Sequence, residues 1–593
     1  MRARLIRLRF RRGLREGQRQ VEDLGSIAEE NLEEHLFKRF DRLASVQRFI
    51  ITWLGLLVIL IGGLVVQNVG LGNYYQTLGT VPGGIYREGI LGRFTNANPL
   101  FATSDADAAV SHLIFAGLLT EDPNGKLVGD LASDYSADPH GTTYTVHLRP
   151  HLTWQDGRPL TSADVLFTYQ MIENPDAQSP FLAGWQGIEV TAPDSRTVIF
   201  KLPSVLAAFP YNLTNGIVPK HLLEHIPATD LRSADFNTTH PVGAGPFAWQ
   251  AVEATGNDPT RAQEQVELTA FPDFHGGQPK LQKFVVRVFA SEKELMTAFK
   301  TNQLTALQMP NDADPQDAIH KGAIAHSMLL RAANMVFFKT SEGVLADAHV
   351  RQALVLSSNA PALIRSLGYP THAVVEPLLT GQLAYDGSLA QSKFDLKAAQ
   401  KLLDDDGWHL GKNGIRLKDN KPLAFNLTVT RNGENRYVAE TLRKQWQAAG
   451  VKVSLQFQDA GDFQTSLSHH EYQAILDGIS IGVDPDVFVY WDSSQADVRS
   501  ANRLNFSEWK NQTADAALEA GRTRLDPRLR IIKYKPFLQA WHDDSPALGL
   551  YQPRMLYLTN GPVNGLTNQP ISAPVDHFMN VQDWEIRQAK VTN

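Results

Sequence analysis

One pattern in this 593-residue chain has the spacing of a catalytic nucleophile. Gly478-Ile-Ser480-Ile-Gly482 matches the elbow on which a serine attacks a carbonyl carbon, with a histidine as base and an acid behind it. That chemistry needs a strand, a sharp turn and then a helix. Here Val483-Asp484-Pro485 follows, and the proline does not open a helix at the required place. A serine hydrolase with His542 or His577 as base is therefore the least favoured function.

Three other patterns are weaker still. Gly243-Ala-Gly245-Pro246 lacks the third glycine and the helix of a dinucleotide-binding loop, and it predicts a turn before a strand. His469-His470 has no spaced carboxylate or third histidine to complete a metal site, and such a pair in a polar stretch is typically solvated. Asp404-Asp405-Asp406 is typical of a solvated helix end. We expect no metal site and no cofactor.

The elements that must position any site alternate between strands and helices. Residues 144–148 alternate as a strand, and Thr161 with Asp164 has the spacing of a capping box that opens a helix. Ser291 with Glu294 has the same spacing. Residues 423–457 read as strand, helix and strand, with Gly450 at the expected helix end, and this β-α-β unit implies parallel strands. The fold class is mixed α/β, and the length predicts at least two lobes.

The N-terminal part predicts a membrane anchor. Phe49 to Val66 contains no charged residue and is long enough to span a bilayer. It lies too far from the N-terminus, and lacks a small-residue cleavage site close behind it, for a cleaved signal peptide. Eight arginines precede it within the first 19 positions, so we expect that side to stay cytoplasmic. The chain has no cysteine, which excludes a lipidated-cysteine anchor as well as disulfides and a thiol nucleophile.

Charge separates the two sides of this segment. Residues 1–48 carry 12 basic and 8 acidic side chains, a net charge of +4, whereas the remaining residues carry 44 and 55, a net charge of −11. An acidic exported part argues against nucleic acid as a partner, because phosphate binding needs a concentrated basic surface. The Arg-rich head either lies on anionic lipid or serves only as a topology signal.

Several phrases in a fixed order carry a family resemblance. They are Asn98-Pro99-Leu100, the stretch from Tyr144 through Trp154, Asp156-Gly157 and Thr161 to Asp164, and His240-Pro-Val-Gly243-Ala-Gly245-Pro246; further on come 347–354, 394–403, Gly407-Trp408 and Asp484-Pro485-Asp486. Together they resemble family 5 of the extracellular solute-binding proteins, the oligopeptide-, dipeptide- and nickel-binding receptors of ABC importers. The similarity covers most of residues 88–500.

The resemblance implies a two-lobed fold of the periplasmic-binding-protein type, with a discontinuous first lobe behind one transmembrane helix. The expected parts are a cytoplasmic Arg-rich head (1–48), a transmembrane signal anchor (49–69), a linker (70–84), lobe I (85–335 and 505–593) and lobe II (336–504). The implied function is a membrane-anchored receptor that is not an enzyme and binds oligopeptides by hinge closure. The implied partners are a peptide and ABC permease subunits, and we expect a monomer at the cell membrane with its C-terminal part outside.

The same resemblance suggests where the ligand lies. In peptide-binding members an aspartate near the Asp-Pro motif commonly pairs with the ligand's terminal ammonium, and Asp484 matches best, with Asp486 second. A turn-forming aspartate is the alternative. Tyr490 and Trp491 are candidates for pocket walls or for core. Asn334 and Phe337 match the strand where the family crosses between lobes, and its edge could pair with an extended peptide.

One alternative function keeps the fold. A receptor that has left transport could act as a signalling or assembly module through its long cytoplasmic head.

Overall fold

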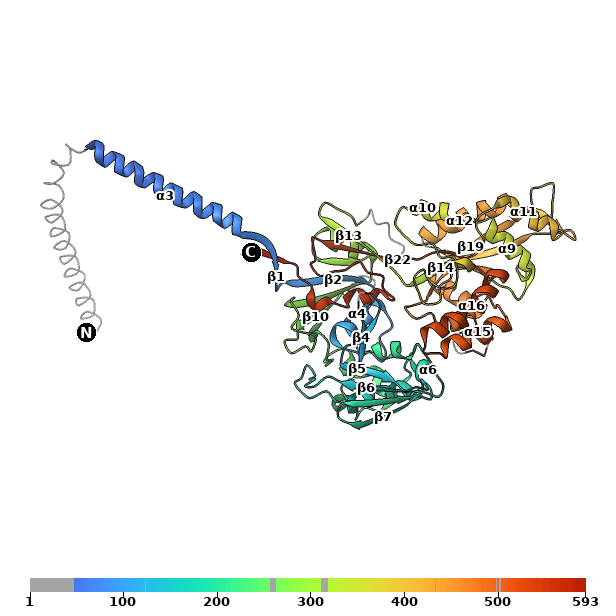
Figure 1. Cartoon of the computed structure of the whole chain (residues 1–593), viewed down its shortest axis with the longest axis horizontal. Helices are drawn as coiled ribbons and strands as arrows, with labels where there is room; N and C mark the ends of the chain where they lie inside the picture. The colour runs from blue at the N-terminus through green and yellow to red at the C-terminus, as the bar shows by residue number, and fades with distance from the viewer. Residues whose placement is uncertain are drawn as a thin grey trace, which may run out of the picture. The chain divides into compact units, whose positions relative to one another are not determined.

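The computed structural model describes residues 47–122, 124–255, 263–310, 318–431, 433–497, 499–500 and 503–592. The chain forms two compact units, one of residues 1–79 with 588–593 and one of residues 80–587. Figure 1 shows the large unit with its mixture of sheets and helices. The fold is mixed α/β, as predicted.

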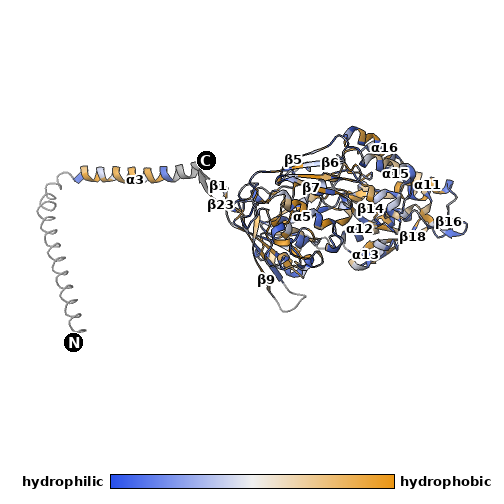
Figure 2. Ribbon diagram, turned by 90° about the horizontal axis from the view of Figure 1, so that it is seen from below, coloured by the Kyte–Doolittle hydropathy of each residue, from blue (hydrophilic) through white to orange (hydrophobic). Residues whose placement is uncertain are grey.

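In the part of the first unit that the structure describes, one long helix, α3, lies at Gln47–Tyr75. Its stretch Phe49–Asn68 is long and apolar enough to cross a membrane, and none of it is buried in the protein. Figure 2 shows the helix coloured as hydrophobic along most of this stretch. The predicted anchor, 49–69, therefore coincides with one continuous helix. The predicted head lies outside the described residues, except for its last two positions.

The predicted linker, 70–84, is not a linker throughout. Helix α3 continues to Tyr75, and strand β1 follows at Gln76–Val81. Strand β1 pairs with β23, Arg587–Thr592, in a two-stranded sheet. The glycines that suggested flexibility do not prevent this pairing, whose partner lies about 500 residues away in the sequence and cannot be seen locally.

A seven-stranded sheet organises the part of the large unit that we call the first lobe. Its order is β13 (Ala323–Leu329), β22 (Arg554–Asn560), β12 (Ala306–Gln308), β2 (Ile85–Leu91), β11 (Lys283–Phe289), β10 (Gln263–Ala270) and β9 (Phe247–Thr255). Strand β2 runs parallel to both β11 and β12. Helix α8, Glu292–Lys300, packs against β2, β11 and β12.

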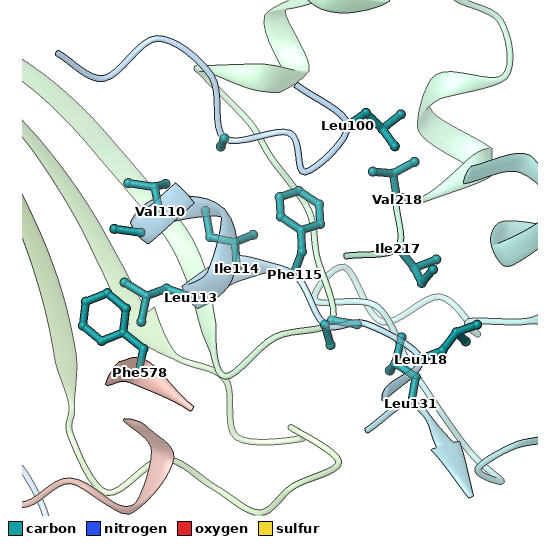
Figure 3. Packing of buried hydrophobic residues seen from close by; sticks show 14 of the residues in the cluster. Leu100, Val110, Leu113, Ile114, Phe115, Leu118, Leu131, Ile217, Val218 and Phe578 are labelled. Atoms are coloured by element: carbon teal, nitrogen blue, oxygen red, sulfur yellow. The ribbon is translucent and has the colours of Figure 1, made fainter. Parts of the chain in front are cut away.

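Helix α4, Asp105–Ile114, packs against the same sheet and starts the core of this lobe. Its residues Val110, Leu113 and Ile114 are fully buried. Figure 3 shows them in one cluster with Phe115 and Leu118, which follow the helix, and with Phe578 from the C-terminal part of the chain. This apolar stripe holds the helix in place, because its burial removes hydrocarbon surface from water.

A four-stranded antiparallel sheet completes the first lobe. Its order is β5 (Ala132–Ala137), β6 (Thr143–Leu148), β8 (Thr197–Lys201) and β7 (Glu189–Asp194), and α5 (Ser162–Glu173) packs against β7 and β8. The strand predicted at 144–148 and the helix predicted after Thr161 are confirmed. Shorter elements follow: β3 (Leu119–Glu121), β4 (Leu127–Gly129), α6 (Leu182–Trp185), η4 (Phe209–Thr214) and α7 (Lys220–Leu223).

The second lobe is built on a five-stranded sheet. Its order is β19 (Lys452–Gln458), β18 (Ala424–Thr430), β20 (Ala474–Ser480), β14 (Ala332–Phe338) and β21 (Ala547–Tyr551). Strands β18 and β19 are parallel and joined by α12, Gly433–Ala448, so the predicted β-α-β unit is confirmed. Further helices of this lobe are α9 (Ala348–Leu356), α10 (Ala360–Ser366), α11 (Leu396–Asp405), α13 (Ala460–His469) and α14 (Phe488–Trp491). A small sheet contains β15 (His409–Leu410), β16 (Arg416–Lys418) and β17 (Lys421–Pro422).

Residues 505–551 differ from the predicted lobe assignment. The sequence placed 505–593 in the first lobe, but β21 pairs with β14 in the five-stranded sheet. Helices α15 (Gln512–Arg522) and α16 (Pro527–Asp544) bury Leu518, Phe537 and Trp541 in a core that also contains residues of β14 and β20. The segment therefore packs with the second lobe, and the chain returns to the first lobe at β22.

Two short connections join the two large sheets. Leu330 and Arg331 lie between β13 and β14, and Gln552 and Pro553 lie between β21 and β22. The connections are bonded to each other: the Leu330 N–H donates to the Pro553 carbonyl at 2.9 Å, and the Gln552 side-chain amide donates to the Leu330 carbonyl at 3.2 Å. Adjacent connections of this kind are a typical position for a hinge, and we refer to this pair of connections as the hinge.

Candidate functional site

A cavity of about 800 Å³ lies in the first lobe. Its wall is drawn from α4, the segment 115–121, α6, η4 and the C-terminal segment 573–582. Its aromatic and ionisable lining residues are His112, Phe115, Glu121, Asp130, Phe181, Trp185, Tyr211, Phe274, Asp576 and Phe578. We call this space the first-lobe cavity.

Local hydrogen bonds position the helix at one wall of the cavity. Ser104 caps α4 by accepting the Asp107 N–H at 3.1 Å. The Asp107 carboxylate accepts the N–H groups of Thr95 at 2.7 Å and Asn96 at 3.0 Å, which ties the preceding loop to the helix. A buried carboxylate with several backbone donors is well compensated, so this corner is rigid.

Glycines let other backbone segments approach the end of α4. A Cβ atom at Gly243 would lie 2.0 Å from the Ile114 carbonyl oxygen, and one at Gly117 would lie 2.5 Å from the Thr214 carbonyl oxygen. The predicted turn at 243–246 leads into β9, as expected, and its glycines serve close packing rather than nucleotide binding.

Glu121 connects the cavity to the hinge. Its Oε2 lies 3.1 Å from Nη1 of Arg331, and both side chains are mostly buried. Burial raises the pKa of Glu121 to about 7; Arg331 acts against this rise, whereas Asp576 and Asp122 add to it. The backbone of Arg331 in turn accepts the Ile481 and Gly482 N–H groups, at 2.9 and 3.0 Å, from the second lobe.

The lobes also meet at a second place. The Ala207 N–H donates to the Arg522 carbonyl at 2.9 Å. Tyr211, in the cavity wall, lies close enough to Asp484 of the second lobe for that carboxylate to contribute to its raised pKa, although burial is the larger cause. The cavity therefore lies beside the interface of the two lobes.

The structure pairs both predicted aspartates with arginines. Asp484 binds Arg530 through two bonds of 2.6 and 2.7 Å, and Asp486 lies 3.1 Å from Arg522. Asp484 also accepts the Asp486 N–H at 3.0 Å, as a turn-forming aspartate does. The segment borders the lobe interface, and its role toward a ligand stays a prediction.

Phe337 and Trp491 lie in the hydrophobic core and not at a surface. Both have no exposed area, and their rings are 5.8 Å apart. A side chain without exposed surface cannot touch a ligand in this state, so the pocket-wall and peptide-pairing interpretations of these two residues are not supported. Phe337 lies on β14, which has β20 on one side and β21 on the other, so this strand is not an edge.

Asn334 and Tyr490 are engaged within the protein. The Asn334 amide donates to the Tyr551 hydroxyl at 2.9 Å, and that hydroxyl lies 2.8 Å from the Glu434 carboxylate. Tyr490 is partly exposed and donates to the Ser480 carbonyl at 2.8 Å. Of the six predicted residues, four share the segment after β20, namely Asp484, Asp486, Tyr490 and Trp491, whereas Asn334 lies beside the hinge.

The nucleophile-elbow pattern does not form an elbow. Ser480 is the last residue of β20, paired with Ala332, and the next helix begins only at Phe488. His542 bonds the Ala390 carbonyl at 2.8 Å, and His577 is buried beside Glu88 in the first lobe. Each histidine is engaged elsewhere, so neither candidate base forms a catalytic pair with Ser480.

His470 differs from its predicted solvated state. Its ring is fully buried, with Nδ1 3.0 Å from a Glu508 oxygen and Nε2 2.9 Å from the Arg503 carbonyl. Its sequence neighbour His469 is exposed, as expected. The prediction for His470 was wrong because its partners, Glu508 and Arg503, lie more than 30 residues away in the sequence.

The three consecutive aspartates form ion pairs at a helix end. Asp404 pairs with Arg416, Asp405 with Lys401 and Asp406 with Lys418. Asp406 also lies within 4.8 Å of Asp347 and His349, a set of atoms of the type that bind metals. Lys418 lies 3.0 Å from Asp406 and 3.9 Å from Asp347, so a positive charge is already supplied.

Sequence reasoning missed the cavity residues. Glu121, Trp185 and Tyr211 come from three separate short elements and share no motif. An aromatic residue in a loop-rich stretch is a weak signal, and only the fold brings these side chains to one wall.

Comparison with known proteins places this geometry in a family. The family described as "Bacterial extracellular solute-binding proteins, family 5 Middle" matches residues 126–500, more than half of the chain. A Brucella ovis protein, whose name describes ABC transporter peptide binding, is 26% identical over 480 residues, which cover 79% of this chain and 86% of the relative. The oligopeptide-binding protein AppA of Bacillus subtilis is 23% identical over 483 residues, with the same coverage.

Solved structures share the fold. AppA of Bacillus subtilis, in complex with a nonapeptide, has a TM-score of 0.68 at 21% identity and covers 86% of this chain and all of its own. NikZ of Campylobacter jejuni, in complex with Ni(L-His), has a TM-score of 0.70 at 23% identity and covers 85% of this chain and 99% of its own. Members of the family are binding receptors and not enzymes, so Ser480 is not a catalytic nucleophile. The chain belongs to family 5 of the bacterial extracellular solute-binding proteins, the substrate receptors of ABC transporters.

Proposed function

We propose that this chain is a membrane-anchored receptor that binds oligopeptides between its lobes, with part of the peptide in the first-lobe cavity. The observation that carries the proposal is the cavity itself. Its volume of about 800 Å³ lies within the roughly 300–1,000 Å³ of ligand pockets. It combines aromatic walls with a few ionisable groups, as such pockets do. The AppA complex with a nonapeptide supports a peptide as the ligand.

Hinge closure is the proposed mechanism. Ligand bound to the first lobe would gain contacts with the second lobe only when the lobes approach, and this difference in contacts favours the closed form. The paired connections at Leu330–Arg331 and Gln552–Pro553 give the lobes a common axis. The Asp484–Asp486 segment and Tyr490 would form the second-lobe side of the closed cleft. Asn334, beside the hinge, would support this side through its bond to Tyr551.

The proposed partners are a peptide and the permease subunits of an ABC importer. Within the family such receptors deliver ligand to a permease, and we propose that this chain does so as a monomer.

We further propose that α3 spans the membrane once, with the N-terminus in the cytoplasm. The support is the uncharged 20-residue stretch Phe49–Asn68 and the arginines that precede it. The full chain should stay in the membrane pellet after alkaline carbonate extraction, with an intact mass that includes residues 1–69. The double variant Leu57→Arg/Ile59→Arg should be released. Release of the unmodified chain, or loss of its N-terminal segment, would refute the anchor.

A cavity-filling variant tests the ligand site. Ala183 lies in the cavity wall and is exposed, so Ala183→Trp should occupy the space without disturbing the core. Ala448, exposed at the end of α12 in the second lobe, is the matched position for Ala448→Trp. With a pool of peptides from a casein digest and native mass spectrometry, the parent chain and Ala448→Trp should retain peptides, and Ala183→Trp should retain few. Equal retention by both variants would place the site elsewhere.

A further inference from the structure

The charged side chains that line the first-lobe cavity are carboxylates. Its ionisable lining residues are His112, Glu121, Asp130 and Asp576, and no lysine or arginine is among the described residues that line it. Burial lowers the pKa of His112, so this ring does not offset the carboxylates at neutral pH. The cavity therefore presents negative potential to whatever enters it.

Each of these carboxylates is held in place. Asp130 lies 2.5 Å from Nε2 of His275. Asp576 accepts the N–H groups of Ser572 at 2.9 Å and Ala573 at 2.7 Å. Glu121 is held by Arg331. Fixed carboxylates need little rearrangement when a ligand binds, which lowers the cost of ordering the site.

Arg331 compensates the buried carboxyl of Glu121 only in part. Burial raises its pKa to about 7 in spite of Arg331, and Asp576 and Asp122 contribute to the rise. A positive ligand group placed among these carboxylates would favour the ionised form of Glu121.

Aromatic rings complete the wall. Phe115, Phe181, Trp185 and Tyr211 all line the cavity, and Phe181 is 38% exposed. The face of an aromatic ring attracts ammonium and guanidinium groups, most strongly where water is excluded. Carboxylates together with aromatic faces are chemically suited to a cation and poorly suited to an anion.

We propose that the first-lobe cavity selects peptides with a basic side chain, an ammonium or a guanidinium, and that Glu121 and Asp576 determine this selectivity. The proposal rests on the proposed function, because it assumes that a peptide enters this cavity. The N-terminal ammonium is the other positive group of a peptide, and the test below separates it from the side chain. Arg331 links the site to the hinge, because its side chain binds Glu121 and its backbone binds the second lobe.

Calorimetric titration with matched tetrapeptides tests the selectivity. Ala-Ala-X-Ala with X as Lys, Met or Glu tests the side chain, and the N-acetylated form of the Met peptide tests the terminal ammonium. The Lys peptide should bind about tenfold tighter than the Met peptide, a difference of about 1.4 kcal/mol that one charge interaction can supply. If only acetylation weakens binding, the cavity does not select a basic side chain and the inference is wrong.

Two variants tie the preference to the named residues. Glu121→Gln and Asp576→Asn keep the size and hydrogen-bonding capacity of the side chains and should reduce the preference to about threefold or less. Glu189→Gln is the matched control, since Glu189 is exposed and pairs with Lys201 on the four-stranded sheet. This variant should leave the preference for the positive ligand unchanged.

Proton release gives an independent readout. If a positive group binds beside Glu121, binding near pH 7 should release protons, and affinity for the positive ligand should rise from pH 6 to pH 8. Titration in two buffers of different ionisation enthalpy measures this release, which Glu121→Gln should abolish. Peptides that bind without preference for positive charge would overturn this inference and leave the proposed function standing. Absence of binding by every peptide would overturn the proposed function and, with it, this inference.

Discussion

Asp484 illustrates why residue type alone did not identify the ligand contact. An aspartate beside a cleft can bind an ammonium, but here the carboxylate accepts two bonds from Arg530, whose side chain is only 6% exposed. The guanidinium comes from α16, 46 residues further along the chain. In this state the pair compensates two charges that have been taken out of water.

We expect Asp484→Asn to destabilise the protein by about 3 kcal/mol, because the buried guanidinium loses its counter-charge. The matched control is Asp497→Asn, whose partner Arg499 is 87% exposed, and it should have a much smaller effect because solvent screens an exposed ion pair. Urea unfolding of both variants measures the difference. Equal stabilities would show that the Asp484–Arg530 pair is not important for folding.

Glu88 gives a pH-dependent prediction. It is fully buried and bonded by the Tyr557 hydroxyl, with His577 Nε2 at 3.8 Å, and burial raises its pKa to about 8. The unfolded chain loses this proton near pH 4.5, so between these values the folded state binds more protons and the contribution of Glu88 to stability falls as pH rises. Glu88→Gln should remove this decline.

The unfolding free energies of the parent and of Glu88→Gln, measured at pH 5 and pH 8, should diverge by about 2–4 kcal/mol in favour of the variant at the higher pH. Parallel pH profiles would mean that Glu88 is already ionised in the folded protein.

At the scale of elements, two identical spacings behave differently. Thr161 with Asp164 and Ser291 with Glu294 both predict capping boxes, and a helix begins at each. The Asp164 carboxylate accepts the Thr161 N–H at 2.8 Å and the Lys220 N–H at 3.0 Å, whereas the Ser291 side chain forms no capping bond. The Asp164 carboxylate also bonds the first residue of α7, and this tertiary contact distinguishes the two helix starts.

We therefore expect Asp164→Ala to lower stability by about 2 kcal/mol, since two partly buried N–H groups lose their acceptor. Glu294→Ala at the matched position should change stability by less than about 0.5 kcal/mol. Thermal or urea unfolding checks both, and a large effect of Glu294→Ala would contradict the role assigned to the bonds.

Local patterns predicted much of the second lobe, but distant pairings could not be predicted. The β18-α12-β19 unit was readable because Val438, Leu442 and Trp446 mark one helix face, and all three are fully buried. The placement of β21 beside β14 was not readable, because it joins segments about 210 residues apart that have no shared pattern. The cavity wall was missed for the same reason, since Glu121, Trp185 and Asp576 meet only in the folded lobe.

At the scale of the molecule, the lobes have separate cores and a two-connection hinge. Among the described residues, two hydrophobic clusters belong to the first lobe and two others belong to the second. The lobes touch near Gly141, where a Cβ atom would lie 3.0 Å from both Val205 of the first lobe and Leu525 of the second. Motion about the hinge would change this contact without disturbing the core of either lobe.

The absence of natural cysteines makes that contact testable. In Val205→Cys/Leu525→Cys a short bismaleimide should crosslink the lobes, and a bound peptide should increase the rate of crosslinking. Val205→Cys/Lys444→Cys, with the second cysteine at an exposed position of α12, should not crosslink. Crosslinking that does not respond to peptide would argue against ligand-driven closure.

The most direct test of the central claim is to identify the small molecules that the purified full chain carries. Denaturation of the protein followed by mass spectrometry of the released material should give a heterogeneous set of short peptides, enriched in lysine and arginine if the cavity selects positive groups. A single non-peptide compound would contradict oligopeptide binding while leaving the family assignment intact. The same experiment on Ala183→Trp should release little or no peptide, and an undiminished set of peptides from this variant would contradict the cavity as the binding site.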